Sequence, residues 1–141
     1  MIVVASSVLV AIGQEEADAD LYLETLENAD HATISPVNAV EAGLVLIGRR
    51  IIQHSRAYDR WLGILGVEIH RDLIDHVAAL EAYLEFGRGY RPAKLNFGNC
   101  FAYALAKQLK APLLYKGRDF AQTDITSALQ PTYPLPAAAG R

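Results

Sequence analysis

The sequence predicts an α/β fold in which a mostly parallel sheet of short strands is covered by helices on both faces, a three-layer α/β/α arrangement. Two observations lead to this prediction. Short β-branched or apolar runs alternate with longer segments of helical periodicity. The chain has 141 residues, of which 52% are apolar and 21% charged, as in an ordinary globular domain. We expect one domain over residues 1–130 and a loose tail over 131–141, where prolines recur before an Ala-Ala-Ala-Gly segment.

The first half of the chain supplies two of the expected strands. The run Ile2–Val4 predicts a buried strand that ends near Ala5, with Ser6 or Ser7 opening a helix. Residues 17–28 predict an exposed helix, and residues 33–34 a short strand. The next two residues, serine and proline, suit the cap and first turn of an apolar helix over 37–47.

The second half continues the alternation. Residues 56–65 predict an amphipathic helix and Val67–Ile69 a strand, after which Asp72 is expected to cap a helix that runs to Phe86. Residues 98–109 predict an alanine-rich helix, and 112–115 a buried strand followed by a turn at 117–119. We expect a last edge strand to begin at Ile125.

Candidate functional residues follow from this topology, because ligands of open α/β sheets bind outside the carboxyl ends of the strands. That rule selects Ala5 and Asp119, although Ala5 by itself suits a core position and Asp119 a turn. Glu41 interrupts an apolar helix, and a solvated position and a functional one are about equally good explanations. Asn99 suits a helix cap. Asp124 is a weaker competitor of Asp119, better suited to capping or surface pairing.

Charge and cysteine content narrow the class of protein. The net charge of −3 disfavours a nucleic-acid binder, but a cation-binding carboxylate cluster would also lower it. Arg88, Arg91 and Lys94, with an interleaved tyrosine, could hold a phosphate backbone, and a solvated loop is an equally good interpretation. Cys100 is expected to be an inert buried thiol; as the only cysteine it indicates a reducing, cytoplasmic compartment. No apolar run is long enough for a membrane span.

Four segments resemble the motifs of VapC-type toxins, which are PIN-domain ribonucleases. Residues 94–106 (KLNFGNCFAYALA) resemble the third motif, with Asn99 where the family has an aspartate. Residues 1–12 (MIVVASSVLVAI) resemble the first motif, again with Ala5 in place of an aspartate. Glu41 matches the glutamate of the family's helix, and residues 113–120 (LLYKGRDF) with 123–125 match the fourth motif. The resemblance covers residues 1 to about 126, in the expected order and spacing.

The resemblance implies a PIN-like fold and a Mg²⁺-dependent endoribonuclease, with Mn²⁺ as a possible substitute for Mg²⁺. Its substrate would be structured RNA such as transfer or ribosomal RNA. It implies a VapB-type antitoxin as the inhibiting partner, and a homodimer. The implied metal positions are Ala5, Glu41, Asn99 and Asp119, with Ser7 as a catalytic helper, and these positions must surround one pocket.

Two of these four positions lack a carboxylate, since Ala5 offers no ligand atom and Asn99 only a carbonyl oxygen. We therefore expect the chain as written to have little or no nuclease activity. The alternative is a catalytically dead PIN module that binds RNA or antitoxin without cleaving.

Overall fold

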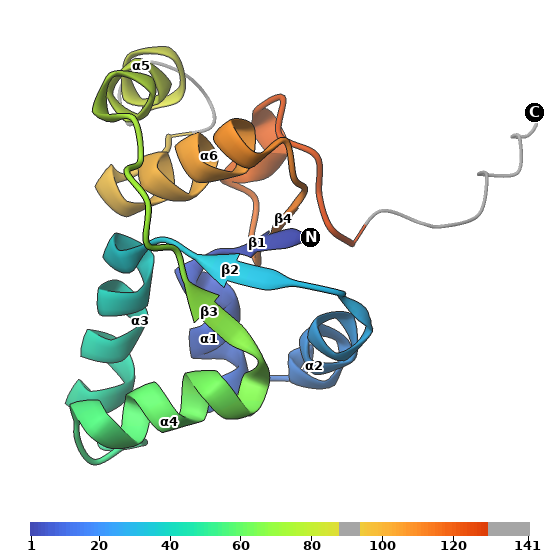
Figure 1. Ribbon diagram of the computed structural model, residues 1–141, viewed down its shortest axis with the longest axis vertical. Helices are drawn as coiled ribbons and strands as arrows, with labels where there is room; N and C mark the ends of the chain where they lie inside the picture. Colours follow the sequence, from blue (N-terminus) through green and yellow to red (C-terminus); the bar gives the residue numbers. More distant parts are fainter. Residues whose placement is uncertain (88–93, 130–141) are drawn as a thin grey trace, which may run out of the picture.

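The computed structural model describes residues 1–87 and 94–129 and contains one four-stranded sheet (Figure 1). The strand order is β3-β2-β1-β4, and each neighbouring pair is parallel. The strands are β1 (Ile2–Val4), β2 (Ala32–Ile34), β3 (Val67–Ile69) and β4 (Leu113–Leu114). All four are short and lie where the sequence predicted strands.

Helices cover both faces of this sheet. Helices α1 (Ser6–Gly13), α2 (Ala19–Asn28), α3 (Pro36–Gly48) and α4 (Ser55–Leu65) lie on one side, whereas α5 (His76–Phe86) and α6 (Phe97–Leu109) lie on the other (Figure 1). A short 3₁₀ turn, η1 (Phe120–Gln122), follows β4. The predicted three-layer α/β/α architecture is confirmed.

The two faces of the sheet bury separate hydrophobic clusters. Successive side chains of a strand point to opposite faces. Val4 therefore packs with α1–α4, whereas Val3 packs with α6 on the opposite face. Leu114 and Leu113 of β4 divide in the same way. Burial on both sides explains why these strands are apolar runs and do not alternate with polar residues.

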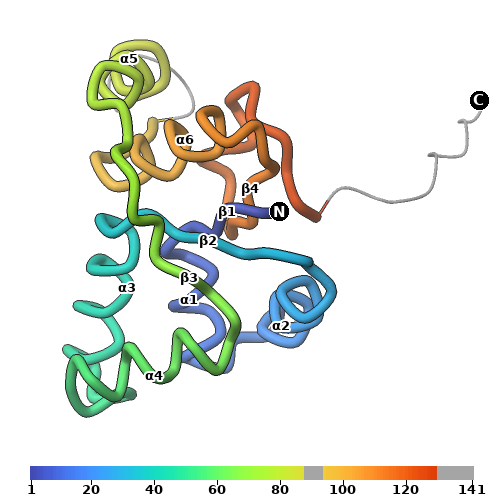
Figure 2. The backbone as a smooth tube through the Cα atoms, viewed as in Figure 1, coloured from blue at the N-terminus to red at the C-terminus, as the bar shows by residue number. Residues whose placement is uncertain are grey.

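The starts of two helices differ from the predictions. Helix α5 is capped by Asp75, which accepts a hydrogen bond from the Val77 amide at 3.0 Å, and not by Asp72. The residues before Asp75 are needed to carry the chain from β3 across to the other face (Figure 2). Helix α6 is capped by Asn96, which places Asn99 inside its first turn. Helix α1 begins at Ser6, as predicted, with Ala5 at its N-cap and no side-chain cap.

The last edge strand predicted at Ile125 is wrong. Nearby, only Ser127 forms a single parallel bridge, with Leu113 of β4. Arg88, Arg91 and the predicted tail lie outside the described residues. No helix in the described ranges has the length and apolar character needed to cross a membrane.

Candidate metal centre

A pocket of about 390 Å³ lies at the carboxyl end of the sheet, where the turn after β4 meets the starts of α1 and α6. Three of the four sequence-predicted positions, Glu41, Asn99 and Asp119, line it together with Ser7. These residues come from α3, α6, the turn after β4, and α1. The structure thus brings together side chains that are far apart in the sequence.

Glu41 is held by side chains that the sequence analysis did not select. Its Oε1 accepts hydrogen bonds from the Ser6 hydroxyl at 3.1 Å and from Asn38 Nδ2 at 2.9 Å. Its carboxylate lies directly over Gly98, where an added Cβ would overlap the carboxylate atoms. Only a glycine therefore leaves room for this carboxylate in its present place. The spacing of Asn38 three residues before Glu41, which puts both on one helix face, was the available signal for Asn38.

Asn99 and Asp119 form the second half of the site. Asn96 accepts the Asn99 backbone N–H at 2.8 Å, which leaves the Asn99 side chain free of any capping role. Its amide Nδ2 donates to Asp119 Oδ2 at 3.3 Å. Asn99 therefore presents its donor nitrogen, and not its carbonyl oxygen, to the acid that the resemblance makes its fellow ligand.

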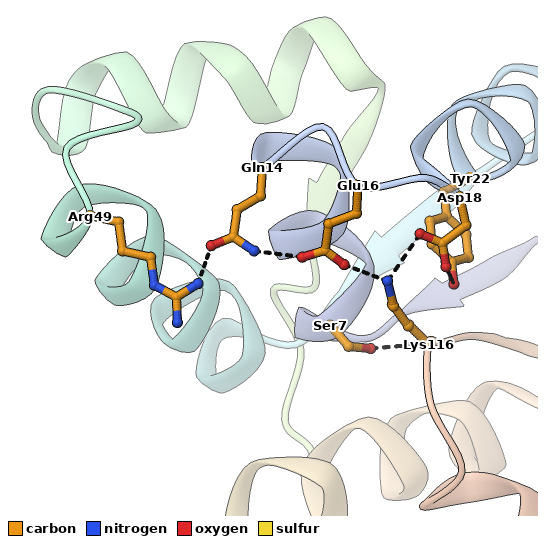
Figure 3. Close-up of polar contacts among 7 residues, drawn as sticks. All are labelled: Ser7, Gln14, Glu16, Asp18, Tyr22, Arg49 and Lys116. Atoms are coloured by element: carbon orange, nitrogen blue, oxygen red, sulfur yellow. Dashed lines mark hydrogen bonds and ion pairs between the residues drawn. The ribbon is translucent and has the colours of Figure 1, made fainter.

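Ala5 and Ser7 lie at the start of α1. Ala5 is 1% exposed and packs in the cluster beneath α6. It offers no polar atom to the pocket. The Ser7 hydroxyl accepts a hydrogen bond from the Lys116 backbone N–H at 3.0 Å, and so fixes the turn that leads to Asp119 (Figure 3).

A chain of polar contacts extends from the pocket residues Glu16 and Lys116 (Figure 3). The Lys116 ammonium contacts Glu16 and lies 3.1 Å from Asp18 Oδ1. The hydrogen bond from Lys116 lowers the pKa of the Glu16 carboxyl, and the two acids raise the pKa of Lys116. Glu16 also accepts from Gln14, which in turn accepts from Arg49. Glu16 lines the pocket, but its carboxylate is engaged by Lys116 and Gln14.

Asp124, the competitor of Asp119, lies outside the pocket. It accepts a hydrogen bond from the Tyr103 hydroxyl at 2.6 Å and pairs with Lys107 at 2.8 Å. The Lys107 contact, followed by the Tyr103 hydrogen bond, lowers the pKa of the Asp124 carboxyl. This geometry gives Asp124 a structural role, and of the two competitors only Asp119 lines the pocket.

Two other candidate residues, Cys100 and Lys94, lie outside the pocket. Cys100 is 3% exposed, and burial raises the pKa of its thiol to about 11, as expected of an inert buried cysteine. Lys94 is exposed and does not line the pocket.

The donor set contains the kind of ligand that a divalent cation needs. Glu41 and Asp119 supply two carboxylates, and Mg²⁺ is typically held by one or two carboxylates together with substrate phosphates. However, no three acidic, histidine or cysteine side chains within residues 1–87 and 94–129 are grouped to hold a metal ion. The Asn99 amide also occupies an oxygen of Asp119.

Comparison with known proteins decides the family. A model of the PIN domain matches residues 2–125. The chain belongs to the PIN-domain family. Within this family it is similar to VapC ribonucleases, which confirms the resemblance found in the sequence. PIN ribonucleases are hydrolases that generally depend on a divalent metal.

Relatives of this PIN domain match over nearly their whole length. VapC ribonuclease Mb0625 of Mycobacterium bovis is 39% identical over 134 residues, which cover 90% of this chain and 97% of that protein. Ribonuclease VapC30 of Mycobacterium tuberculosis is 39% identical over 133 residues, covering 92% and 99%. The crystal structure of Mycobacterium tuberculosis VapC20, described as a Sarcin-Ricin loop cleaving toxin, superposes with a TM-score of 0.66. It shares 16% identity over 89% of this chain and 97% of that chain, and thus agrees in fold.

Proposed function

We propose that the chain is a Mg²⁺-dependent endoribonuclease toxin of a type II toxin–antitoxin (VapBC) system, with little or no activity as written. The observation that supports this most directly is that Glu41 and Asp119 line one pocket with Asn99. Ala5 and Asn99 stand at the positions where the family motifs have aspartates. The proposal therefore has two parts: the nuclease activity that the family motifs imply, and the loss of that activity in this chain.

The chemistry at this pocket would depend on the two remaining acids. Glu41 and Asp119 would hold Mg²⁺, or Mn²⁺ in its place, and a bound divalent ion orients a phosphate and acidifies the attacking water. Ser7 contributes by fixing the turn before Asp119 through its bond to the Lys116 amide. Asn99 opposes cation binding as it stands, because its amide hydrogens face Asp119.

The size of the expected loss follows from two missing contacts. A hydrogen bond or ligand contact to a charged group contributes about 1.5–3 kcal/mol. Two such losses add to roughly 3–6 kcal/mol, and each 1.4 kcal/mol is about a tenfold change in affinity. We expect cleavage by the chain as written to be slower than that of a restored chain by about two to four orders of magnitude.

The test restores both aspartates. The chain as written, Ala5→Asp, Asn99→Asp and the double variant are incubated with structured RNA, with Mg²⁺ and with Mg²⁺ plus EDTA. We expect cleavage by the double variant in Mg²⁺ only. As a control for contaminating nuclease, the double variant with Asp119→Asn must lose the activity, whereas the double variant with Asp124→Asn must keep it. A double variant that leaves the RNA intact contradicts the proposal.

Substrate and partners are part of the same proposal. We expect transfer or ribosomal RNA as substrate, a VapB-type antitoxin as inhibitor, a homodimer, and action in the cytoplasm. Arg88, Arg91 and Lys94 are proposed to contact the RNA backbone, since cations near the substrate offset phosphate charge. Replacing all three by alanine should weaken RNA binding and reduce its salt dependence, measured by filter binding.

One contact favours the second candidate, a PIN module that binds RNA or antitoxin without cleaving. The Asn99 amide satisfies Asp119 by a hydrogen bond, so the pocket can exist without a cation. An uncleaved RNA that nevertheless binds to the restored double variant would favour this candidate. The two functions are thus separated by binding and cleavage measured on one protein.

A further inference from the structure

Asn38 is a fully buried polar side chain in contact with Glu41. It is 0% exposed and lies on α3, one turn before Glu41. Its Nδ2 donates to Glu41 Oε1 at 2.9 Å and to the Gly98 carbonyl oxygen at 2.9 Å. Its Oδ1 accepts from the Ser35 hydroxyl at 2.5 Å. Every polar atom of this side chain is therefore in use, and two of its three partners are at the site.

The direction of the Asn38 amide is fixed by two acceptors, the Glu41 carboxylate and the Gly98 carbonyl, and Ser35 supplies a matching donor. The Ser35 hydroxyl oxygen accepts from the Asn38 backbone N–H at 3.0 Å, so its hydrogen is available to donate to Asn38 Oδ1. A flipped amide would place Oδ1 against the carboxylate of Glu41 and the carbonyl of Gly98, where three acceptors would face one another. The amide nitrogen must therefore face the site.

This arrangement distinguishes the two oxygens of Glu41. Oε1 receives hydrogen bonds from both Ser6 and Asn38, whereas no hydrogen bond to Oε2 is found among the described residues. Oε2 thus has no hydrogen-bond donor among these residues and lies beside Gly98. The second Asn38 bond reaches Gly98, the residue next to Asn99, and connects α3 to the first turn of α6.

We infer that Asn38 is a positioning residue, which holds the Glu41 carboxylate through Oε1 and fixes α3 against the turn that carries Asn99. This inference rests on the proposed function in treating Glu41 as a metal ligand. Partners that orient metal ligands are worth about 10–100-fold in metal affinity when removed. A merely structural asparagine would change stability and leave metal affinity unaltered.

The experiment uses the full chain with Ala5→Asp and Asn99→Asp, here called the restored chain. Asn38→Leu removes the donors and keeps the number and branching of the heavy atoms, and Ser35→Ala removes the hydroxyl that donates to Asn38 Oδ1. The matched control is Thr33→Val, which removes another buried hydrogen bond, to the Glu68 carbonyl at 3.1 Å, away from the pocket. Mn²⁺ binding is measured by electron paramagnetic resonance below the melting temperature of each variant.

We expect Asn38→Leu to weaken Mn²⁺ binding by about 10–100-fold. Ser35→Ala should weaken it by several fold, and Thr33→Val should leave it unchanged. In RNA cleavage, Asn38→Leu should raise the Mg²⁺ concentration for half-maximal rate while the KM for RNA at saturating Mg²⁺ stays the same. If Asn38→Leu does not fold, Ser35→Ala provides the same comparison with the control.

The outcomes distinguish the positioning role of Asn38 from the proposed nuclease function. Unchanged Mn²⁺ affinity in Asn38→Leu, or in Ser35→Ala where the former does not fold, overturns the positioning role even if the restored chain cleaves RNA. Weakened Mn²⁺ affinity in a restored chain that cleaves no RNA supports the positioning role and contradicts the nuclease. A restored chain that binds no Mn²⁺ overturns both.

Discussion

Restoring an aspartate at position 99 should destabilise the metal-free protein. Asn99 Nδ2 lies 3.3 Å from Asp119 Oδ2, so Asn99→Asp would replace an attractive contact by two facing carboxylate oxygens. Asp119 is exposed, so the dielectric constant of water is appropriate. At this distance the repulsion between unit charges is then about 1 kcal/mol. The lost hydrogen bond adds about 1 kcal/mol, and side-chain rotation relieves part of the sum.

We therefore expect Asn99→Asp to lower the free energy of unfolding in EDTA by about 1–2 kcal/mol, or the melting temperature by roughly 3–8 °C for a chain of this size. Circular dichroism melts measure this directly. Saturating Mg²⁺ should reverse the order, because a ligand at 100 times its Kd stabilises the folded state by about 2.7 kcal/mol.

Gln53→Glu is the control, since it adds one negative charge at an exposed residue that does not line the pocket and should change stability by less than about 0.5 kcal/mol. An Asn99→Asp variant that melts as high as the unmodified chain in EDTA would refute the assignment of this contact.

Three further predictions concern the surroundings of the site. Lys107 holds the pKa of Asp124 below its ordinary value of 3.8, so this pair stabilises the fold above that pH and the stabilisation is lost as pH falls through the lowered pKa. Asp124→Asn should therefore flatten the acid limb of a stability–pH curve, by less than about 1 kcal/mol because the pair is largely exposed. Cys100, with its pKa raised to about 11, should react with a thiol reagent at pH 8 only as the protein unfolds, and fast labelling of the native chain would contradict its burial. Gly98→Ala should cost about 0.5–1.5 kcal/mol of stability, because its Cβ would displace the Glu41 carboxylate from its hydrogen bonds to Ser6 and Asn38. The same substitution in a Glu41→Ala background should cost clearly less, and equal costs in the two backgrounds would refute the contact.

The sequence predicted the elements of the fold well because the sheet is buried on both faces. Strands β1 and β4 are then short apolar runs between helical periods, whereas β2 and β3 each carry one polar residue in a run that is otherwise apolar. The helix starts were harder to predict, because a cap depends on which of several polar residues the tertiary structure places at the turn. Asp72 and Asp75 are chemically equal candidates, and only the path of the chain between the layers selects Asp75.

The candidate site was predictable where family motifs mark it, and not elsewhere. Glu41 and Asp119 do line one pocket, as the motifs required, and the structure separates Asp119 from Asp124 by giving the latter its own partners. Asn38 and Gly98 were missed because their roles arise from a contact between α3 and α6. In the sequence, Asn38 is simply one polar residue in an apolar helix, and only the structure shows that it is buried.

The residues of the pocket are divided among the three layers of the fold. Glu41 belongs to a helix on one face of the sheet, Asn99 to a helix on the other, and Asp119 to the turn that ends a strand. Detachment of either helical layer would therefore separate the side chains that line the pocket even if the rest stayed folded. Affinity for a cation at this pocket would accordingly depend on the packing of all three layers. A bound ion would in turn stabilise that packing.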